Sequence, residues 1–171
     1  MKPKHDIDVW FTSDLHLGND HCANTRKLNN AAEHDYYLTE NINSYVGKRG
    51  KLFILGDAID TKHGIKWAKN IQCQNIELII GNHDQMSPSF YIDELGWKVH
   101  AFKKYRDFWL SHCPMHPHEI REMLGNVHGH IHVWGDTQII KDPRYFNVNP
   151  EFHQMKPVSV MEIYKQLEAK T

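Results

Sequence analysis

The sequence predicts an α/β (α+β) fold in which two packed, mixed β-sheets are flanked by helices. Short apolar runs typical of buried strands recur along the whole chain. Helical patterns alternate with these runs in the first half, whereas strands with short connections dominate the second half. Two sheets with helices on their outer faces bury such a set of elements most simply.

The predicted strands are apolar runs bounded by polar or turn-forming residues, and they are rich in β-branched and aromatic side chains. Such side chains fit a pleated, half-buried surface. In chain order the runs are Ile7–Phe11, Lys51–Leu55, Ile76–Ile80, Lys98–Phe102, Asp107–Ser111, Val127 with its neighbours, Tyr145–Val148 and Val158–Ile163.

The clearest predicted helix covers residues 31–46. There Leu38, Ile42 and Val46 recur at a spacing of four, which gives one apolar stripe, and glycines follow the last turn. Ser87-Pro88 has the composition of a helix start. The shorter helical patterns lie at 63–72, 88–95 and 115–124.

Length and composition describe one ordinary globular domain, which we expect to cover residues 1–171. A net charge of -1 provides no overall attraction to duplex nucleic acid, and no apolar stretch is long enough to span a bilayer. The start, MKPKHDIDVW, lacks the apolar core of a secretion signal. We therefore expect a cytoplasmic protein without a membrane or duplex partner, and the oligomeric state stays open.

Residues that can bind metal ions follow five of the apolar runs. The motifs are Asp14-x-His16, Gly56-Asp57-x-x-Asp60, Gly81-Asn82-His83-Asp84, Ser111-His112 and Gly129-His130-x-His132. Each motif alone is typical of a turn, and a single His-x-His is a weak metal signal. Because ligands gather at the carboxyl ends of strands, five such ends together predict one shared site.

In this order the motifs resemble those of the calcineurin-like metallophosphoesterase superfamily, over the span from Asp14 to His132. The resemblance implies a four-layer αββα sandwich with two divalent cations. It assigns three residues to the first cation: Asp14, His16 and His132. It assigns Asn82, His112 and His130 to the second, and it makes Asp57 the bridge between the two.

The resemblance also implies a catalytic pair. His83 is expected to act as a general acid at the leaving-group oxygen, and Asp60 is expected to orient it. A carboxylate beside an imidazole stabilises the imidazolium and fixes its direction. The alternative for His83 is a histidine that caps a turn or supports a ligand. Asp84 is expected to cap the next segment or to hydrogen-bond a ligand, outside the catalytic pair.

Imidazole and carboxylate donors without thiolate suit Mn, Fe, Co, Ni or Zn, and Mn is our first expectation. Two carboxylates against two divalent cations leave an excess of positive charge that attracts a phosphate ester. This charge balance does not separate monoesters from diesters. Cys113 follows the predicted ligand His112, but alternation along a strand is expected to turn its side chain away.

We expect a dinuclear phosphoesterase acting on small phosphodiesters, such as nucleotide-like or cyclic nucleotide esters, by attack of a metal-bridging hydroxide. A phosphomonoesterase (a nucleotide or protein phosphatase) and a noncatalytic binding module are the alternatives. Protein phosphatases carry Arg-Gly after Gly-Asp-x-x-Asp, whereas Thr61-Lys62 follows Asp60 here. A basic patch at residues 103–106 keeps nuclease activity open.

Both ends of the chain resemble the small stand-alone bacterial and phage members of the superfamily. The resemblance lies in the opening Leu15-His16-Leu17-Gly18-Asn19 and the ending NVNPEFHQMKPVSVMEI. In such a protein Val158–Ile163 would form an edge or closing strand.

Overall fold

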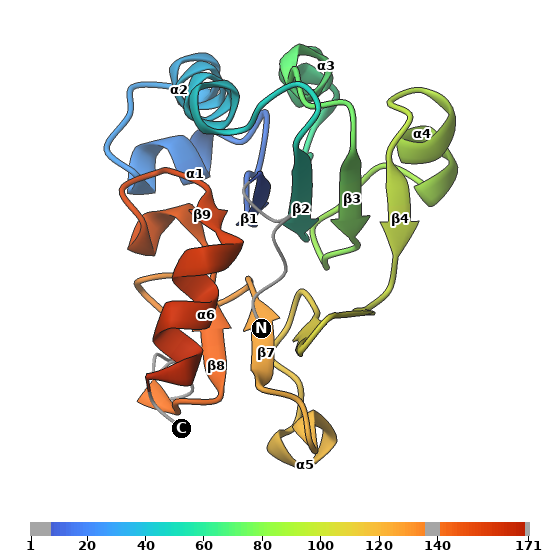
Figure 1. Ribbon diagram of the computed structural model, residues 1–171. Helices are drawn as coiled ribbons and strands as arrows, with labels where there is room; N and C mark the ends of the chain where they lie inside the picture. Colours follow the sequence, from blue (N-terminus) through green and yellow to red (C-terminus); the bar gives the residue numbers. More distant parts are fainter. Residues whose placement is uncertain (1–7, 136–140, 170–171) are drawn as a thin grey trace.

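A computed structural model describes residues 8–135 and 141–169 of the chain. The strands form two mixed sheets with helices around them (Figure 1). The first sheet has the order β4-β3-β2-β1-β9, and the second has the order β5-β6-β7-β8. Strands β1 to β4 run parallel, while β9 is antiparallel to β1 and β5 is antiparallel to β6. The predicted fold class is confirmed.

The strands are short, and most of them match the predicted runs. The first sheet contains β1 (Val9–Thr12), β2 (Lys51–Leu55), β3 (Ile76–Ile79), β4 (Lys98–His100) and β9 (Val158–Ser159). The second contains β5 (Lys103–Tyr105), β6 (Phe108–Leu110), β7 (Gly125–His128) and β8 (Tyr145–Asn147). Ile7, where the first run was predicted to begin, lies outside the described residues.

The helices lie in the connections between strands, except α6, which follows β9. They are α1 (Asp20–Thr25), α2 (Ala31–Tyr45), α3 (Ile65–Asn70), α4 (Pro88–Asp93), α5 (Pro117–Ile120) and α6 (Val160–Glu168), with short 3-10 turns at Lys62–Gly64 and Pro150–Phe152. The predicted start at Ser87-Pro88 is confirmed, because the Ser87 side chain accepts a hydrogen bond from the Phe90 N–H. No helix in the described ranges is long and apolar enough to cross a membrane.

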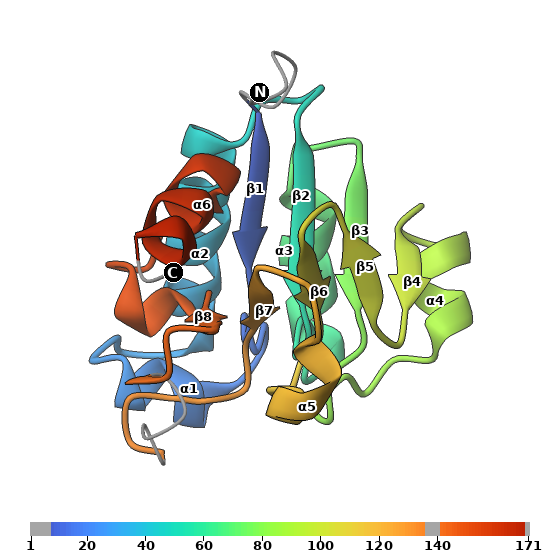
Figure 2. The ribbon, with the colours of Figure 1, turned by 60° about the horizontal axis from the view of Figure 1, so that its bottom comes forward.

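Alternation along the strands divides the core into two layers. In β2, Leu52 and Ile54 belong to the cluster that contains Leu38 and Ile42 of α2. Phe53, on the opposite face, belongs to the cluster between the two sheets. Figure 2 shows α2 and α3 behind the first sheet, with β6 and β7 in front of it. The first sheet is therefore buried on both faces, which holds its strand ends rigidly.

The prediction of a strand over Val158–Ile163 is wrong beyond Ser159. The edge position is confirmed, since β9 stands at the end of the first sheet and pairs with β1. Ser159 then starts α6 through a capping box with Glu162. Ile163 and Leu167 lie four apart and are buried on one face of this helix.

Two other boundaries differ from the sequence prediction, and one helix was not predicted. The strand predicted at Lys98–Phe102 ends at His100, because the chain then leaves the first sheet and enters the hairpin of β5 and β6. Arg106, in the turn of that hairpin, lies in the left-handed region (φ 53°). The helix predicted at 115–124 is the single turn of α5. Helix α1 was not predicted; Asn19 caps it by accepting a hydrogen bond from the Cys22 N–H.

Candidate metal centre

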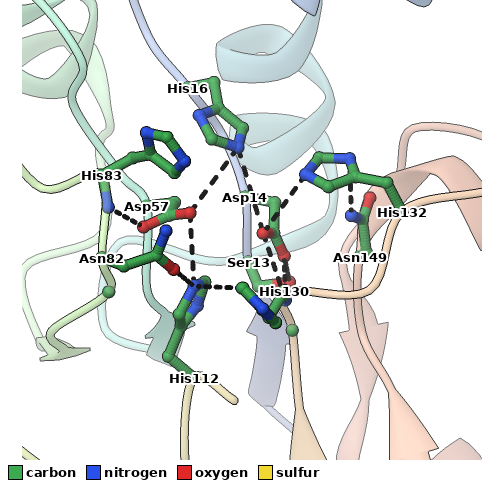
Figure 3. A network of polar contacts seen from close by, with 12 residues as sticks. Ser13, Asp14, His16, Asp57, Asn82, His83, His112, His130, His132 and Asn149 are labelled. Carbon is green, nitrogen blue, oxygen red and sulfur yellow. Dashed lines mark hydrogen bonds and ion pairs between the residues drawn. The ribbon is translucent and has the colours of Figure 1, made fainter. Parts of the chain in front are cut away.

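The structure brings the seven predicted metal ligands together at one edge of the sheets (Figure 3). They come from loops that follow β1, β2 and β3 in the first sheet and β6 and β7 in the second. Short contacts between their donor atoms connect Asp14, His16, Asp57, Asn82, His112, His130 and His132. Residues 118 positions apart in the chain thus share one site.

Asp14 is the centre of a first group of donors. Its Oδ1 lies 4.0 Å from His16 Nε2 and 3.7 Å from His132 Nε2. These three side chains can present one donor atom each to a single cation. Their oxygen and nitrogen donors are those that divalent transition metals accept.

Asp57 lies between this group and a second one. Its Oδ2 is 3.8 Å from His16 Nε2 and 3.2 Å from His112 Nε2. His112 Nε2 is in turn 2.8 Å from Asn82 Oδ1 and 3.3 Å from His130 Nδ1. The position of Asp57 is therefore the one that a bridging carboxylate would need.

The donor set fits a metal ion in its spacing. Ligand atoms about 2.0–2.2 Å from a common cation lie roughly 3–4.2 Å apart. These contacts fall in that range except the one between His112 Nε2 and Asn82 Oδ1, which is 2.8 Å. His16 Nε2 is buried and has no hydrogen-bond partner in the described residues. In Figure 3 it points between Asp14 and Asp57. Buried polar atoms are almost always paired, and a cation here would satisfy this one.

Three of the histidines are fixed through their other ring nitrogen. The Nδ1 atoms of His16 and His132 donate to the carboxylates of Asp60 (3.0 Å) and Glu151 (2.8 Å). The Nδ1 atom of His112 donates to the Leu55 carbonyl at 2.8 Å. Each ring therefore keeps Nε2 toward the site. This is the arrangement by which proteins set the tautomer and direction of metal-binding histidines.

The backbone at the site is held in a sparsely populated conformation. Asp14 (φ 49°), His16 (φ 47°), Asp57 (φ 55°) and His130 (φ 66°) all lie in the left-handed region. This region is unfavourable for residues other than glycine and persists where surrounding structure enforces it. Strain at four predicted ligands indicates that the fold positions these side chains at the expense of local backbone energy.

Two motif glycines allow the close approaches in this centre. A Cβ on Gly56 would lie 2.1 Å from His112 Nδ1, and a Cβ on Gly81 would lie 2.1 Å from Asp57 Oδ1. Gly56 also has a positive φ of 89°. The glycines beside the polar residues are therefore required by space, since any side chain there would displace a predicted ligand.

The carboxylates of the centre favour positive charge beside them. Burial alone would raise the pKa of Asp57, but the hydrogen bond and charge of His112 hold it below its usual value. Burial would lower the pKa of His16 and of His112, but the hydrogen bonds to Asp60 and to Asp57 respectively raise both. The carboxylates thus attract positive charge, which protons or metal ions can supply.

Asp60, which was predicted to orient His83, contacts His16 and Asn19 in the structure. Both oxygens of Asp60 lie 3.0 Å from His16 Nδ1, and Asn19 Nδ2 donates to Oδ2 at 2.6 Å. An isolated parallel bridge between Leu17 and Ile59 aligns the two loops and brings Asp60 beside the Asp-x-His motif. Asp60 therefore orients a predicted metal ligand.

His83 is exposed at the edge of the centre. Its backbone N–H donates to Asp57 Oδ1 at 2.7 Å. Its ring lies 5.5 Å from the His16 ring, edge to face. The exposed side chain of His83 thus lies beside both the bridging position of Asp57 and the His16 ring.

Asp84, left open by the sequence, supports the backbone of the centre. Its carboxylate accepts from the N–H groups of Asp57 (3.0 Å), Ala58 (2.8 Å) and Gly81 (2.7 Å). The Tyr91 hydroxyl donates to it as well, at 2.8 Å. One carboxylate therefore ties the Gly-Asp loop to the Gly-Asn-His-Asp loop.

Sequence reasoning missed a buried ion pair behind the first group of donors. Arg26 Nε donates to Glu151 Oε1 at 2.9 Å, and both side chains are nearly inaccessible. The same Oε1 accepts from His132, and Arg26 Nη2 donates to the Asp14 carbonyl at 2.7 Å. No motif marks these residues, because they meet only after 125 positions of chain have folded between them.

Glu151→Gln is expected to weaken divalent cation binding by roughly 10- to 100-fold, because His132 loses a charged acceptor that orients its ring and raises its basicity. Isothermal titration with Mn²⁺ or Zn²⁺ measures the affinity, and thermal unfolding shows that the variant is folded. The exposed Glu40→Gln is the matched control. Wild-type affinity in folded Glu151→Gln would contradict the role of this ion pair.

The expectation that Cys113 faces away from the site is wrong. Its Sγ lies within 4.8 Å of a ring nitrogen of His112 and of one of His130, in a group that could hold a metal ion. Strand β6 ends at Leu110, so the alternation of a strand does not extend to residue 113.

The two mixed sheets with flanking helices are consistent with the metallophosphoesterase sandwich, and the centre contains groups of residues that could hold metal ions. The chain belongs to the calcineurin-like phosphoesterase family, whose model matches residues 7–166. This family is the one that the motifs resemble, so the recognition is confirmed.

Relatives of similar extent occur in phages and archaea. The chain is 28% identical to the Gene 66 protein of Mycobacterium phage D29, over 94% of this chain and 98% of the phage protein. It is also 28% identical to an uncharacterized protein of Methanocaldococcus jannaschii, over 94% and 91% of the two chains. The similarity to these two relatives therefore extends over most of each chain.

A solved structure shares the fold. The protein of unknown function AQ665 from Aquifex aeolicus superposes with a TM-score of 0.70 at 21% identity, covering 92% of this chain and 97% of that one.

Proposed function

We propose that the protein hydrolyses phosphate esters at a two-cation centre, with small nucleotide-like phosphodiesters as its preferred substrates. The observation that carries the proposal is the position of Asp57. Its Oδ2 lies within 4 Å of both His16 and His112, which belong to the two groups of donors. A shared carboxylate is the feature that distinguishes a paired centre from two separate sites.

In the proposed centre Asp14, His16 and His132 hold one divalent cation, Asn82, His112 and His130 hold the other, and Asp57 contacts both. Mn²⁺ is the favoured metal, with Fe, Zn, Co or Ni as alternatives. When bound, the two cations offset phosphoryl charge and lower the pKa of a coordinated water. The protein contributes the orientation of the donors through Asp60, Glu151 and the Leu55 carbonyl.

His83 is proposed to hold a proton at the leaving-group side. Its backbone contact with Asp57 fixes the start of the side chain beside the bridge, and the ring remains exposed to a substrate. From there the imidazolium can pass its proton to a departing alkoxide. Asp60 is not part of this step, because its carboxylate is engaged by His16 and Asn19.

The contacts of two residues near the centre, Thr61 and Arg26, favour a diester substrate over a monoester. Thr61, which stands where protein phosphatases carry an arginine, donates to the Gly18 carbonyl at 3.1 Å and so stabilises a loop. The buried guanidinium of Arg26 is engaged by the Asp14 carbonyl, Glu151 and His34. Neither residue therefore offers a free, positively charged hydrogen-bond donor to the second negative charge of a phosphate monoester.

Turnover of bis(4-nitrophenyl) phosphate is expected to exceed that of 4-nitrophenyl phosphate in kcat/KM when protein freed of metal is reloaded with Mn²⁺. Absorbance of the released nitrophenolate measures both reactions, and elemental analysis measures the bound metal. A higher value for the monoester would favour the phosphomonoesterase. Bound metal without turnover of either ester would favour a noncatalytic binding module.

A further inference from the structure

We propose that the Cys113 thiolate is a further ligand of the second cation, beside His112 and His130. This inference rests on the proposed two-cation centre and gives its two positions different chemistry. The first position would keep only oxygen and nitrogen donors, whereas the second would gain a sulfur donor. Sequence motifs assign no such role to the residue.

The geometry supports a shared ion. The Cys113 sulfur and a ring nitrogen from each of His112 and His130 lie within 4.8 Å of one another. For a cation with a sulfur ligand at about 2.3 Å and nitrogen ligands at about 2.0–2.1 Å, these atoms would lie roughly 3.1–4.4 Å apart. The observed upper limit of 4.8 Å is close to the spacing that one shared ion requires.

Hydrogen bonds fix the turn that directs Cys113 into the centre. The Ser111 hydroxyl donates to the Cys113 carbonyl at 2.6 Å, and the Gly129 N–H donates to the His112 carbonyl at 3.0 Å. The Met115 N–H donates to Asn126 Oδ1 at 2.9 Å on the other side of the turn. The thiol is thus carried by a well-anchored loop between two strands.

The Cys113 side chain is also accessible to ions from solution. It is exposed, and with Asn82 and His112 it lines a hollow of about 330 Å³ beside the centre. The other two cysteines, Cys22 and Cys73, are buried and each only 6% exposed. Cys113 is therefore the thiol that a metal ion or a reagent reaches first, and the buried pair supplies internal controls.

Sulfur ligation has two chemical consequences. Binding converts the thiol to a thiolate and releases one proton to solvent. The thiolate adds one negative charge to the second position, so the net positive charge of the metal-loaded centre falls by one. A thiolate is a soft donor, which shifts preference at this position from Mn²⁺ toward Zn²⁺, Co²⁺ or Fe²⁺. A centre with one hard and one softer position would bind two different metals.

Cobalt binding tests this ligand without any activity measurement. Titration of metal-free protein with Co²⁺ is expected to give visible d–d bands together with a near-ultraviolet thiolate-to-cobalt charge-transfer band. The charge-transfer band should disappear in Cys113→Ser and persist in Cys22→Ser and Cys73→Ser. In wild-type protein, Zn²⁺ should protect Cys113 from alkylation, as read by mass spectrometry.

Each outcome decides between the two proposals. Cobalt d–d bands without the charge-transfer band, a band that survives Cys113→Ser, or alkylation unaffected by Zn²⁺ would overturn the thiolate ligand while leaving the two-cation centre intact. Failure of wild-type protein to bind Co²⁺, Zn²⁺ or Mn²⁺ would instead overturn the centre itself. Protection measured on wild-type protein does not depend on the folding of any variant.

Discussion

Asp57→Asn is expected to remove both cations and at least roughly 1,000-fold of phosphoesterase activity, equivalent to about 4 kcal/mol of barrier. The loss reaches both positions because Asp57 Oδ2 faces His16 on one side and His112 on the other. Asparagine keeps an oxygen that can accept from the His83 N–H, so the loop is expected to fold. It lacks the charge that a bridging ligand provides.

Elemental analysis after dialysis measures the number of bound cations, and hydrolysis of a nitrophenyl diester measures activity. The matched control is Asp93→Asn, on the exposed side of α4. Retention of two cations and full turnover by Asp57→Asn would sink the bridging assignment. Loss of one cation alone would place Asp57 in a single site and leave a mononuclear enzyme.

The candidate ligands could be picked out of the sequence because their signal is local. Each lies within a few residues of an apolar run, and the ends of parallel strands meet at one edge of a sheet. Gly56 and Gly81 carry a further local signal, since close approach to a ligand leaves no room for a side chain. The sequence therefore contains both the donors and the space they need.

The partners of these ligands were not predictable, because they depend on how distant loops come together. Asp60 contacts His16 through a bridge between loops 44 positions apart. Glu151 reaches His132 only when the segment after β8 folds against the centre. Such contacts have no spacing rule in the sequence, and family analogy assigned Asp60 to a different histidine.

Two further misreadings come from assuming that a strand continues. Val158–Ile163 is apolar enough for a strand, but Ser159 and Glu162 form a capping box that starts a helix after two residues. The side chain of Cys113 was predicted to point away from the site, on the assumption that β6 continues past His112. Strand β6 ends at Leu110. Capping chemistry and strand length decide both cases, and both are weak signals in a single sequence.

His83→Asn is expected to slow hydrolysis of an alkyl phosphodiester by roughly 100- to 10,000-fold, and to slow hydrolysis of a nitrophenyl diester far less. An alkoxide needs a proton in order to depart, whereas nitrophenolate leaves without one. The substitution keeps the backbone N–H that contacts Asp57, so the bridge is undisturbed. Product release from the two esters, measured at equal metal loading, gives the comparison; His21→Asn, exposed on α1, is the control.

Asp60→Asn separates proton transfer from metal orientation in the same assay. Because the Asp60 carboxylate contacts His16 Nδ1, its loss is expected to weaken metal binding and to slow both esters by the same factor. Equal losses on the two esters in His83→Asn would exclude the general acid and leave His83 as a supporting residue. A leaving-group dependence in Asp60→Asn would show instead that this carboxylate turns to His83 during the reaction, against the geometry of the structure.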